Sequence, residues 1–341
     1  MEYFLLSLVF LTLLPNLFVA GMHDVSNSIA IPVRTRALTP RIAARLAAFF
    51  NALGVLLALP IGAHLYTWFD FPQVPGRLML SILLSTLISL LAWNIITYLR
   101  GVPSSTTHAL LAGLLGGGFA ATLLTDTTLS DVMELPWLGL LLALIISPLV
   151  AFGLGYALVF GSVRMARGED PDTVNATSRM VQSICVGITS LGTGLQQGQR
   201  FMFLTMLGLL SAGVADTTPA LPYLIAGFAV LIGLGCLTGG WRIGHVLGHR
   251  LVALDPLRGM VSASTTSGLV LLGSMGLGMP LSTSLTAASA TMGAGSNQRF
   301  TTVNWRQFLR ILTYWLATPV ATGVGSATLT LAVNPLLGLP D

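Results

Sequence analysis

The chain has 341 residues, of which 54% are hydrophobic and only 8% are charged, and its mean hydropathy is +0.82. Soluble domains carry roughly 25% charged residues, so this composition excludes a soluble protein and predicts an all-α integral membrane protein. The net charge of +4 comes from sixteen basic residues, all arginine, and in a membrane protein such an excess is typical of topology signals rather than of nucleic-acid binding.

Apolar stretches long enough for helices across a ~30 Å hydrocarbon core follow one another along the chain. The arginines between them cluster at five places: 34–45, 100, 164–179, 242–258 and 299–310. Placing these clusters in the cytoplasm leaves only Arg77 and Arg200 elsewhere and predicts that both termini lie outside. About ten crossings result: 3–33, 46–68, 78–99, 108–125, 135–160, 180–213, 220–240, 260–277, 283–298 and 308–333.

The two halves of the chain read as a repeat. Each half makes an odd number of predicted crossings, so the halves are inverted relative to each other, as in many secondary transporters. We predict that repeat 1 comprises residues 1–163, that a cytoplasmic connector comprises 164–179, and that repeat 2 comprises 180–341.

Matched polar motifs support this division. Asp24 lies 79 residues before Pro103, and Gln197 lies 83 residues before Pro280. Each half therefore has a polar stretch in its first crossing, followed about eighty residues later by a proline and a Ser/Thr cluster. We interpret both polar stretches as breaks in the first crossing of each half, and both prolines as openings of re-entrant hairpins.

The first polar stretch, "AGMHDVSNSIA" at 20–30, places chemically active side chains at membrane depth. Asp24 is the only Asp or Glu within a predicted crossing, and an unpaired carboxylate there costs ~3 kcal/mol, which favours a role in binding a cation or a proton. Asn27, one turn later, offers an oxygen on the same face for a coupling cation. His23 and Asn51 are candidates for the same site or, equally, structural hydrogen-bonding residues.

The hairpin motif "GVPSSTTHALLAGLLGGG" at 101–118 has four consecutive hydroxyls ahead of a helix of small residues. Ser104 or Ser105 is a candidate N-cap, and the first amides and hydroxyls of such a helix form a natural anion site. The second half repeats this pattern, and Gln196 and Gln197 in "LGTGLQQGQR" stand where the first half has its acid. The predicted substrate-binding residues are Ser104, Ser105, Thr106, Thr107, Gln196, Gln197, Ser282, Thr283 and Ser284.

These motifs resemble the PiT family of inorganic phosphate transporters, in particular its bacterial branch. The family's G-x-N/H-D-x-x-N is matched by "GMHDVSN", and its P-x-S-[ST]-[ST]-H by "PSSTTH" at 103–108. The second half departs from the pattern: Gln197 replaces the second Asp, Gln196 an Asn, and Thr193 and Leu285 two histidines. The resemblance implies two inverted repeats with two re-entrant hairpins, commonly assembled as a homodimer.

The resemblance also bears on coupling. Sodium-coupled members tend to have Glu at the position of Asn51, whereas similar proton-coupled members have Asn there and His at the position of His23. We therefore expect a secondary transporter of inorganic phosphate in the inner (plasma) membrane, driven by a proton gradient in preference to sodium and needing no cofactor or bound metal.

Three alternatives stay open at this point. Another tetrahedral oxyanion, chiefly sulfate, is the nearest. A membrane enzyme would need a nucleophile with a positioned base or a metal cluster, and no such spacing is recognisable. A channel is disfavoured by the predicted inverted repeats with broken helices.

Overall fold

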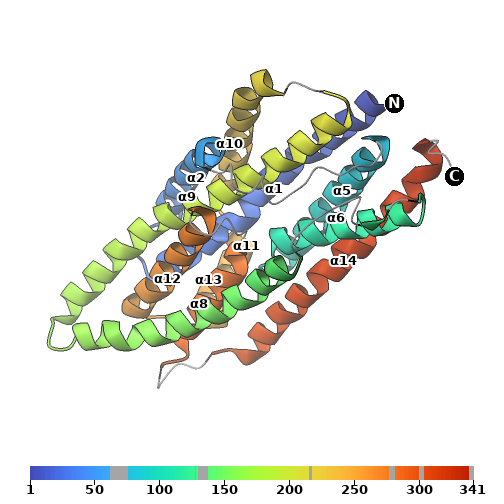
Figure 1. Cartoon of the computed structure of the whole chain (residues 1–341). Coiled ribbons are helices and arrows are strands. Elements are labelled where there is room, and N and C mark those ends of the chain that lie inside the picture. Colours follow the sequence, from blue (N-terminus) through green and yellow to red (C-terminus); the bar gives the residue numbers. More distant parts are fainter. Residues whose placement is uncertain are drawn as a thin grey trace.

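The computed structural model describes residues 1–61, 76–126, 128–129, 137–214, 217–275, 281–298 and 303–337. All the regular secondary structure in these ranges is helical, and long helices lie side by side as an elongated bundle (Figure 1). The first half contains α1 (Glu2–Arg34), α2 (Pro40–Leu56), α3 (Ala58–Ile61), α5 (Gly76–Arg100), α6 (Thr106–Thr122) and α8 (Trp137–Met165). The second half contains α9 (Pro171–Ser211), η1 (Thr218–Ala220), α10 (Leu221–Leu237), α11 (Trp241–His245), η2 (Val246–Leu251), α12 (Pro256–Met275), α13 (Thr283–Gly295) and α14 (Trp305–Leu337).

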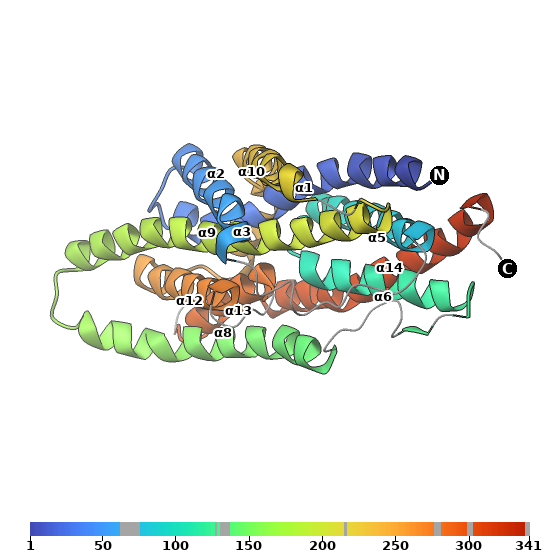
Figure 2. The same ribbon diagram turned by 45° about the horizontal axis from the view of Figure 1, so that its top comes forward.

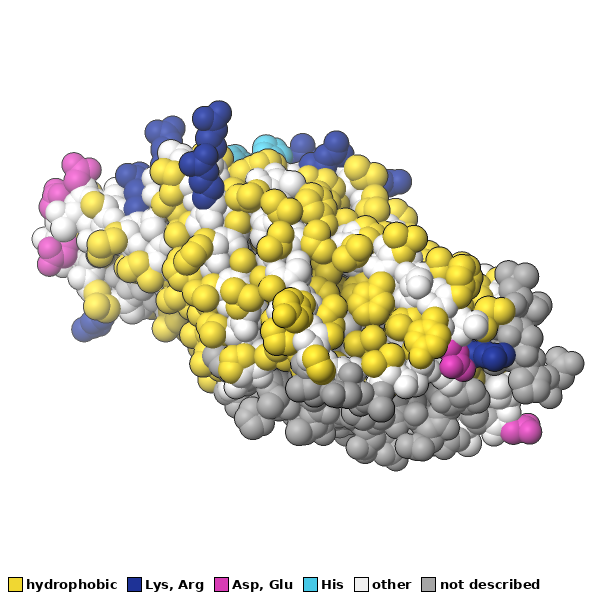
Figure 3. All heavy atoms as spheres, turned by 90° about the horizontal axis from the view of Figure 1, so that it is seen from above, with side chains coloured by type: hydrophobic (Ala, Val, Ile, Leu, Met, Phe, Trp, Pro, Cys, Tyr) yellow, Lys and Arg dark blue, Asp and Glu magenta, His cyan; other side chains and the backbone are white. Residues whose placement is uncertain are grey.

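The surface and the helix lengths suit a lipid bilayer. Four helices in the described part are long and apolar enough to cross a membrane, namely α1, α5, α8 and α14; α10 and the segment Trp241–Leu251, bent by 47° at a short break, make a fifth if they form one span. Hydrophobic side chains cover the middle of the face in Figure 3, and arginines gather along one edge. The protein is therefore a membrane protein, and the figure of about ten crossings stays a prediction.

The predicted breaks in the first crossings are wrong. Helix α1 is continuous through 20–30, and α9 is continuous for 41 residues through 191–200. The physical reason is that an unwound backbone leaves N–H and C=O groups unpaired, at a cost of several kcal/mol each away from water, whereas polar side chains find partners without unwinding the helix. The breaks lie instead just before α6 and α13, which have only 17 and 13 residues.

Two other boundaries also differ from the sequence expectation. Helix α9 begins at Pro171, inside the predicted connector, and Asp170 caps it by accepting a hydrogen bond from the amide of Thr173. Pro280, the predicted opening of the second hairpin, and residues 62–68 of the second predicted crossing lie outside the described residues.

The two halves pack against each other reciprocally. Helix α1 packs on α10 while α2 packs on α9, and α6 packs on α14 while α13 packs on α8. In Figure 2 the pair α8 and α13 lies toward one end of the bundle, and α6 and α14 lie toward the other. Each half thus contributes one helix to every one of these four contacts.

Glycines bring the backbones of these crossing helices into direct contact. A Cβ at Gly21 would overlap the carbonyl of Ile232, and one at Gly235 would overlap that of Phe18. This close approach is how helices associate in membranes, where packing and not water exclusion supplies the stabilisation. The same reciprocal contact occurs between α2 and α9, where Gly54 meets Leu191 and Gly194 meets Asn51.

Replacing Gly235 by Ala should destabilise the protein, because the new methyl group would push α10 away from α1. Overpacking of this kind costs about 1–3 kcal/mol, so the melting temperature in detergent should fall by several degrees. Gly227 lies in the same helix and has open space around its built Cβ in the described structure, so Gly227→Ala is the matched control. Equal melting temperatures for the two variants would contradict the packing role of Gly235.

Candidate functional site

Helix α1 presents His23, Asp24 and Asn27 on its inner side. Asp24 is only 4% exposed, and its Oδ2 accepts a hydrogen bond of 2.8 Å from Nε2 of Gln197 on α9. The same Nε2 also lies 3.3 Å from the carbonyl oxygen of Ala20. The two residues that the sequence places at equivalent positions of the two halves therefore lie in direct contact at the centre of the molecule.

His23 connects Asp24 to the first hairpin. Its Nδ1 lies 3.5 Å from Asp24 Oδ1, and its Nε2 lies 3.3 Å from both Thr97 Oγ1 and Ser104 Oγ. The two hydroxyl oxygens are 3.1 Å apart. A buried cluster of polar groups thus runs from the carboxylate through the imidazole to the residues ahead of α6, and a proton on either His23 or Asp24 has hydrogen-bonding partners within reach.

The first hairpin places the N-terminus of α6 next to this cluster. Ser105 is the N-cap: its Oγ accepts from the amide of His108 at 3.3 Å and lies 2.6 Å from Nδ1 of that histidine. Thr106 and Thr107 occupy the first turn and are buried, and Thr106 Oγ1 has no partner in the described part of the chain. Free amides at a helix N-terminus and an unpaired hydroxyl are suitable donors for an oxyanion.

The second hairpin is built in the same way and meets the same helix. Ser282 caps α13 by accepting from the amide of Leu285 at 3.3 Å. Asn27 Nδ2 donates to Ser284 Oγ at 2.9 Å and lies 3.5 Å from Thr283 Oγ1. Since His23 contacts the residues before α6 and Asn27 contacts those at the start of α13, two helix N-termini converge on one turn of α1, with Asp24 between them.

Two predicted site residues lie at the edge of this cluster. Gln196 donates to Ser274 of α12 at 3.0 Å, so its amide group turns away from Asp24. Asn51 is buried, and its backbone contacts Gly194, one turn before Gln197, while its side-chain Oδ1 has no partner among the described residues.

The sequence analysis missed Thr97. A hydroxyl in the last turn of an apolar helix, just before a Gly-Pro turn and a Ser/Thr run, was the available signal, but the contact with His23 depends on how α1 and α5 pack.

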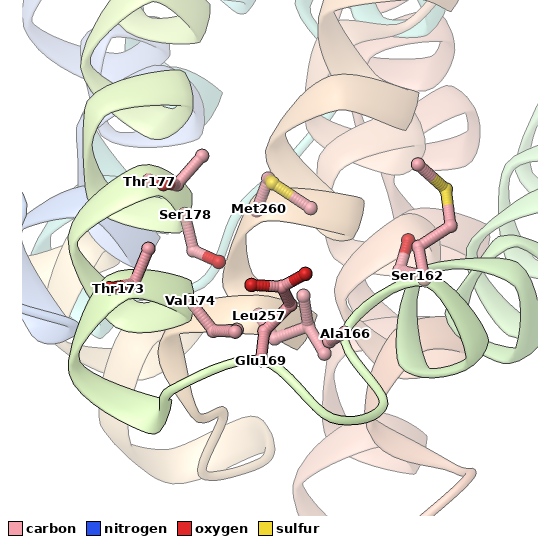
Figure 4. Close-up of a pocket in the computed structure, with 10 residues that line it drawn as sticks. Ser162, Ala166, Glu169, Thr173, Val174, Thr177, Ser178, Leu257 and Met260 are labelled. Carbon is pink, nitrogen blue, oxygen red and sulfur yellow. The ribbon is translucent and has the colours of Figure 1, made fainter.

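A separate pocket of about 300 Å³ lies at another level of the bundle, between α8, α9 and α12 (Figure 4). Its lining includes Glu169, Thr173, Ser178 and Met260. Ser178 precedes Gln197 by nineteen residues on the same helix, a distance of ~28 Å at 1.5 Å per residue. This pocket is therefore not part of the cluster around Asp24.

Comparison with known proteins gives this geometry a context. The model of a family described as "Phosphate transporter family" matches residues 20–169 and 161–326, which together make up most of the chain. This chain belongs to that family.

Individual relatives agree. A probable low-affinity inorganic phosphate transporter of Rhizobium meliloti (strain 1021) is 33% identical over 315 residues, which cover 91% of each chain. Proteins with the same description from Mycobacterium bovis and Bacillus subtilis are 32% and 29% identical over 332 and 311 residues, covering 96% and 91% of this chain and 78% and 91% of theirs. The resemblance to the PiT family is thereby confirmed, and the chain is a transporter-family protein rather than an enzyme.

A solved structure, titled "The sodium-dependent phosphate transporter", has the same fold. It superimposes with a TM-score of 0.78 over 97% of this chain and 99% of its own, at 21% sequence identity. At that identity the similarity establishes the fold alone.

Proposed function

We propose that this protein is a secondary active transporter that moves inorganic phosphate across the plasma membrane, coupled to a cation gradient. The observation that carries the proposal is the convergence of the α6 and α13 N-termini on His23 and Asn27, on either side of Asp24. Positive helix ends with Ser and Thr hydroxyls suit an oxyanion, and the adjacent carboxylate suits the coupling cation. The family and its relatives support phosphate as the substrate.

We favour a proton over sodium as the coupling ion. Asp24 has an imidazole nitrogen 3.5 Å from one oxygen and an amide donor on the other. A carboxylate beside a histidine holds a proton between two basic groups, and His is the side chain whose charge changes most easily near neutral pH. A sodium ion at Asp24 would compete with a protonated His23 for the same carboxylate.

Reciprocal packing supports the inverted repeats. With Gly21 matched to Gly194, and Gly54 matched to Gly235, the backbone carbonyls that these glycines contact match as well: Ile232 with Asn51, and Phe18 with Leu191. The sequence offset is 173 residues for Phe18 and Leu191 as for Gly21 and Gly194, and 181 for Asn51 and Ile232 as for Gly54 and Gly235. Two inverted repeats rocking about a central site provide alternating access. The outside location of both termini and a homodimeric assembly stay predictions.

Sulfate is the second candidate substrate. Phosphate differs from it at neutral pH by carrying a proton that can be donated to an acceptor. The replacement of the second acid removes one such acceptor, but Gln197 Oε1 is buried and has no partner among the described residues, so an acceptor is retained beside Asp24. This favours phosphate.

Purified protein in proteoliposomes tests the proposal. Uptake of labelled phosphate and of labelled sulfate is measured under an imposed proton gradient and, separately, under a sodium gradient. We expect phosphate accumulation driven by the proton gradient, with sodium replaced by choline. Strict dependence on sodium would refute proton coupling, and accumulation of sulfate without phosphate would refute the substrate assignment.

Thr106→Val and Thr283→Val should each raise the KM for phosphate. Each variant removes one hydroxyl donor from a helix N-terminus while keeping the shape of the side chain. A hydrogen bond to a charged ligand contributes about 1.5–3 kcal/mol, which corresponds to a rise of roughly tenfold or more. Thr106→Ser and Thr283→Ser, which keep the hydroxyl, are the matched controls. An unchanged KM in both valine variants would mean that these residues only complete the helix ends.

A further inference from the structure

Arg200 is an arginine that the topology pattern leaves unexplained. It lies on α9, three residues after Gln197, so the two side chains share one face of the helix. Its Nη1 is buried and has no hydrogen-bond partner in the described part of the chain. A buried guanidinium donor that stays unpaired is costly, which calls for a partner that this side chain receives at some stage of its function.

The guanidinium lies within electrostatic range of Asp24. Asp24 is the only acidic residue among the buried residues of the described structure, so these two opposite charges balance each other inside the protein. Asp24 is flanked by His23 and Asn27, which contact the starts of the two hairpin helices. Arg200 therefore lies near the same centre on which those helix ends converge.

The amide at Gln197 changes what Arg200 has to neutralise. With an acid at both positions, one guanidinium would face two carboxylates that compete for its donors. Here Gln197 uses its Nε2 to bond Asp24 Oδ2 and brings no charge. One carboxylate is thus already hydrogen-bonded, and the N–H groups of Arg200 stay available for another negatively charged group.

We propose that Arg200 is a direct ligand of the transported oxyanion and acts together with the hydroxyls and amides of the two hairpins. The proposal rests on the proposed function and names the one cationic side chain of that site within the described structure. A guanidinium matches a phosphate in shape, because its planar N–H groups donate two parallel hydrogen bonds to two oxygens. The empty site is then neutral, and phosphate replaces the missing partner of Arg200.

Equilibrium binding of labelled phosphate to purified protein tests this assignment. Arg200→Gln should weaken binding by about tenfold or more, since it removes charge-assisted hydrogen bonds, and Arg200→Lys should retain most of the affinity because it keeps the charge and the donors. Arg77 is the matched control: it is a surface arginine paired with Glu2 at 3.6 Å, and Arg77→Gln should bind phosphate like the wild type. Melting temperatures in detergent identify any variant that does not fold, and Arg200→Lys is the variant expected to fold in every case.

A second pair of variants separates a ligand from a counter-ion of Asp24. In Asp24→Asn no carboxylate is left to neutralise, so a mere counter-ion role gives equal phosphate affinity with Arg or Gln at position 200. The same loss of affinity in Asp24→Asn/Arg200→Gln as in Arg200→Gln supports the ligand role, and equal affinities in that background overturn it. A wild type that neither binds nor transports phosphate would refute the proposed function itself, whereas an active wild type with unchanged binding in Arg200→Gln refutes only the role of Arg200.

Discussion

Asp24→Asn should abolish gradient-driven uptake of phosphate while the protein still folds and inserts. The carboxylate is 4% exposed, and its partners are Gln197 and His23. An asparagine at this position can still accept the hydrogen bond from Gln197 but cannot take up a proton or hold a cation. Phosphate should then only equilibrate across the membrane, and accumulation against its gradient should disappear.

The measurement is uptake into proteoliposomes with and without a proton gradient, together with exchange of labelled for unlabelled phosphate. Exchange should persist in the variant, because it needs binding and reorientation but no net coupling. Burying a neutral amide is easier than burying a carboxylate, which costs ~3 kcal/mol in a bilayer when unpaired, so the melting temperature should not fall. Asp172→Asn, the same change at an exposed residue in the first turn of α9, should leave uptake unchanged. Accumulation at the wild-type level by Asp24→Asn would remove this residue from the coupling mechanism.

Gln197→Asp should add one coupling cation to each transport cycle. The amide nitrogen of Gln197 lies 2.8 Å from Asp24 Oδ2, so an acid at position 197 would place two carboxylates next to each other. Two such groups do not both ionise unless a cation lies with them, and the pKa of one is raised strongly. The variant should therefore bind an additional proton, or become able to use sodium, when it loads phosphate.

The stoichiometry is measured as the number of protons taken up per phosphate, and from the pH gradient needed to hold a given phosphate gradient at equilibrium. Gln197→Asn is the matched control, because Asn has the length of Asp without its charge, and it should keep the wild-type ratio. An unchanged ratio in Gln197→Asp would show that this position does not set the number of coupling ions.

Both experiments follow from features that the sequence alone predicted in outline. Hydropathy and charge distribution determined that this is an all-helical membrane protein, because those properties depend on composition along the chain and not on contacts. The capping roles of Ser105 and Ser282 were predictable for a similar reason: a cap bonds an amide three residues away in the same segment. Asp24 was predictable because burying a lone carboxylate in lipid has a cost that demands a role.

Only the tertiary structure decided which side chains meet. The contact of Asp24 with Gln197, and that of Asn27 with Ser284, join residues 173 and 257 positions apart, and both depend on the rotation of each helix and on glycines that set the distance between helices. The same packing turned Gln196 toward Ser274, brought Thr97 to His23 and left Arg200 without a partner for Nη1. It also kept α1 and α9 unbroken, because neighbouring helices supplied partners for polar side chains that sequence alone had suggested would unwind them.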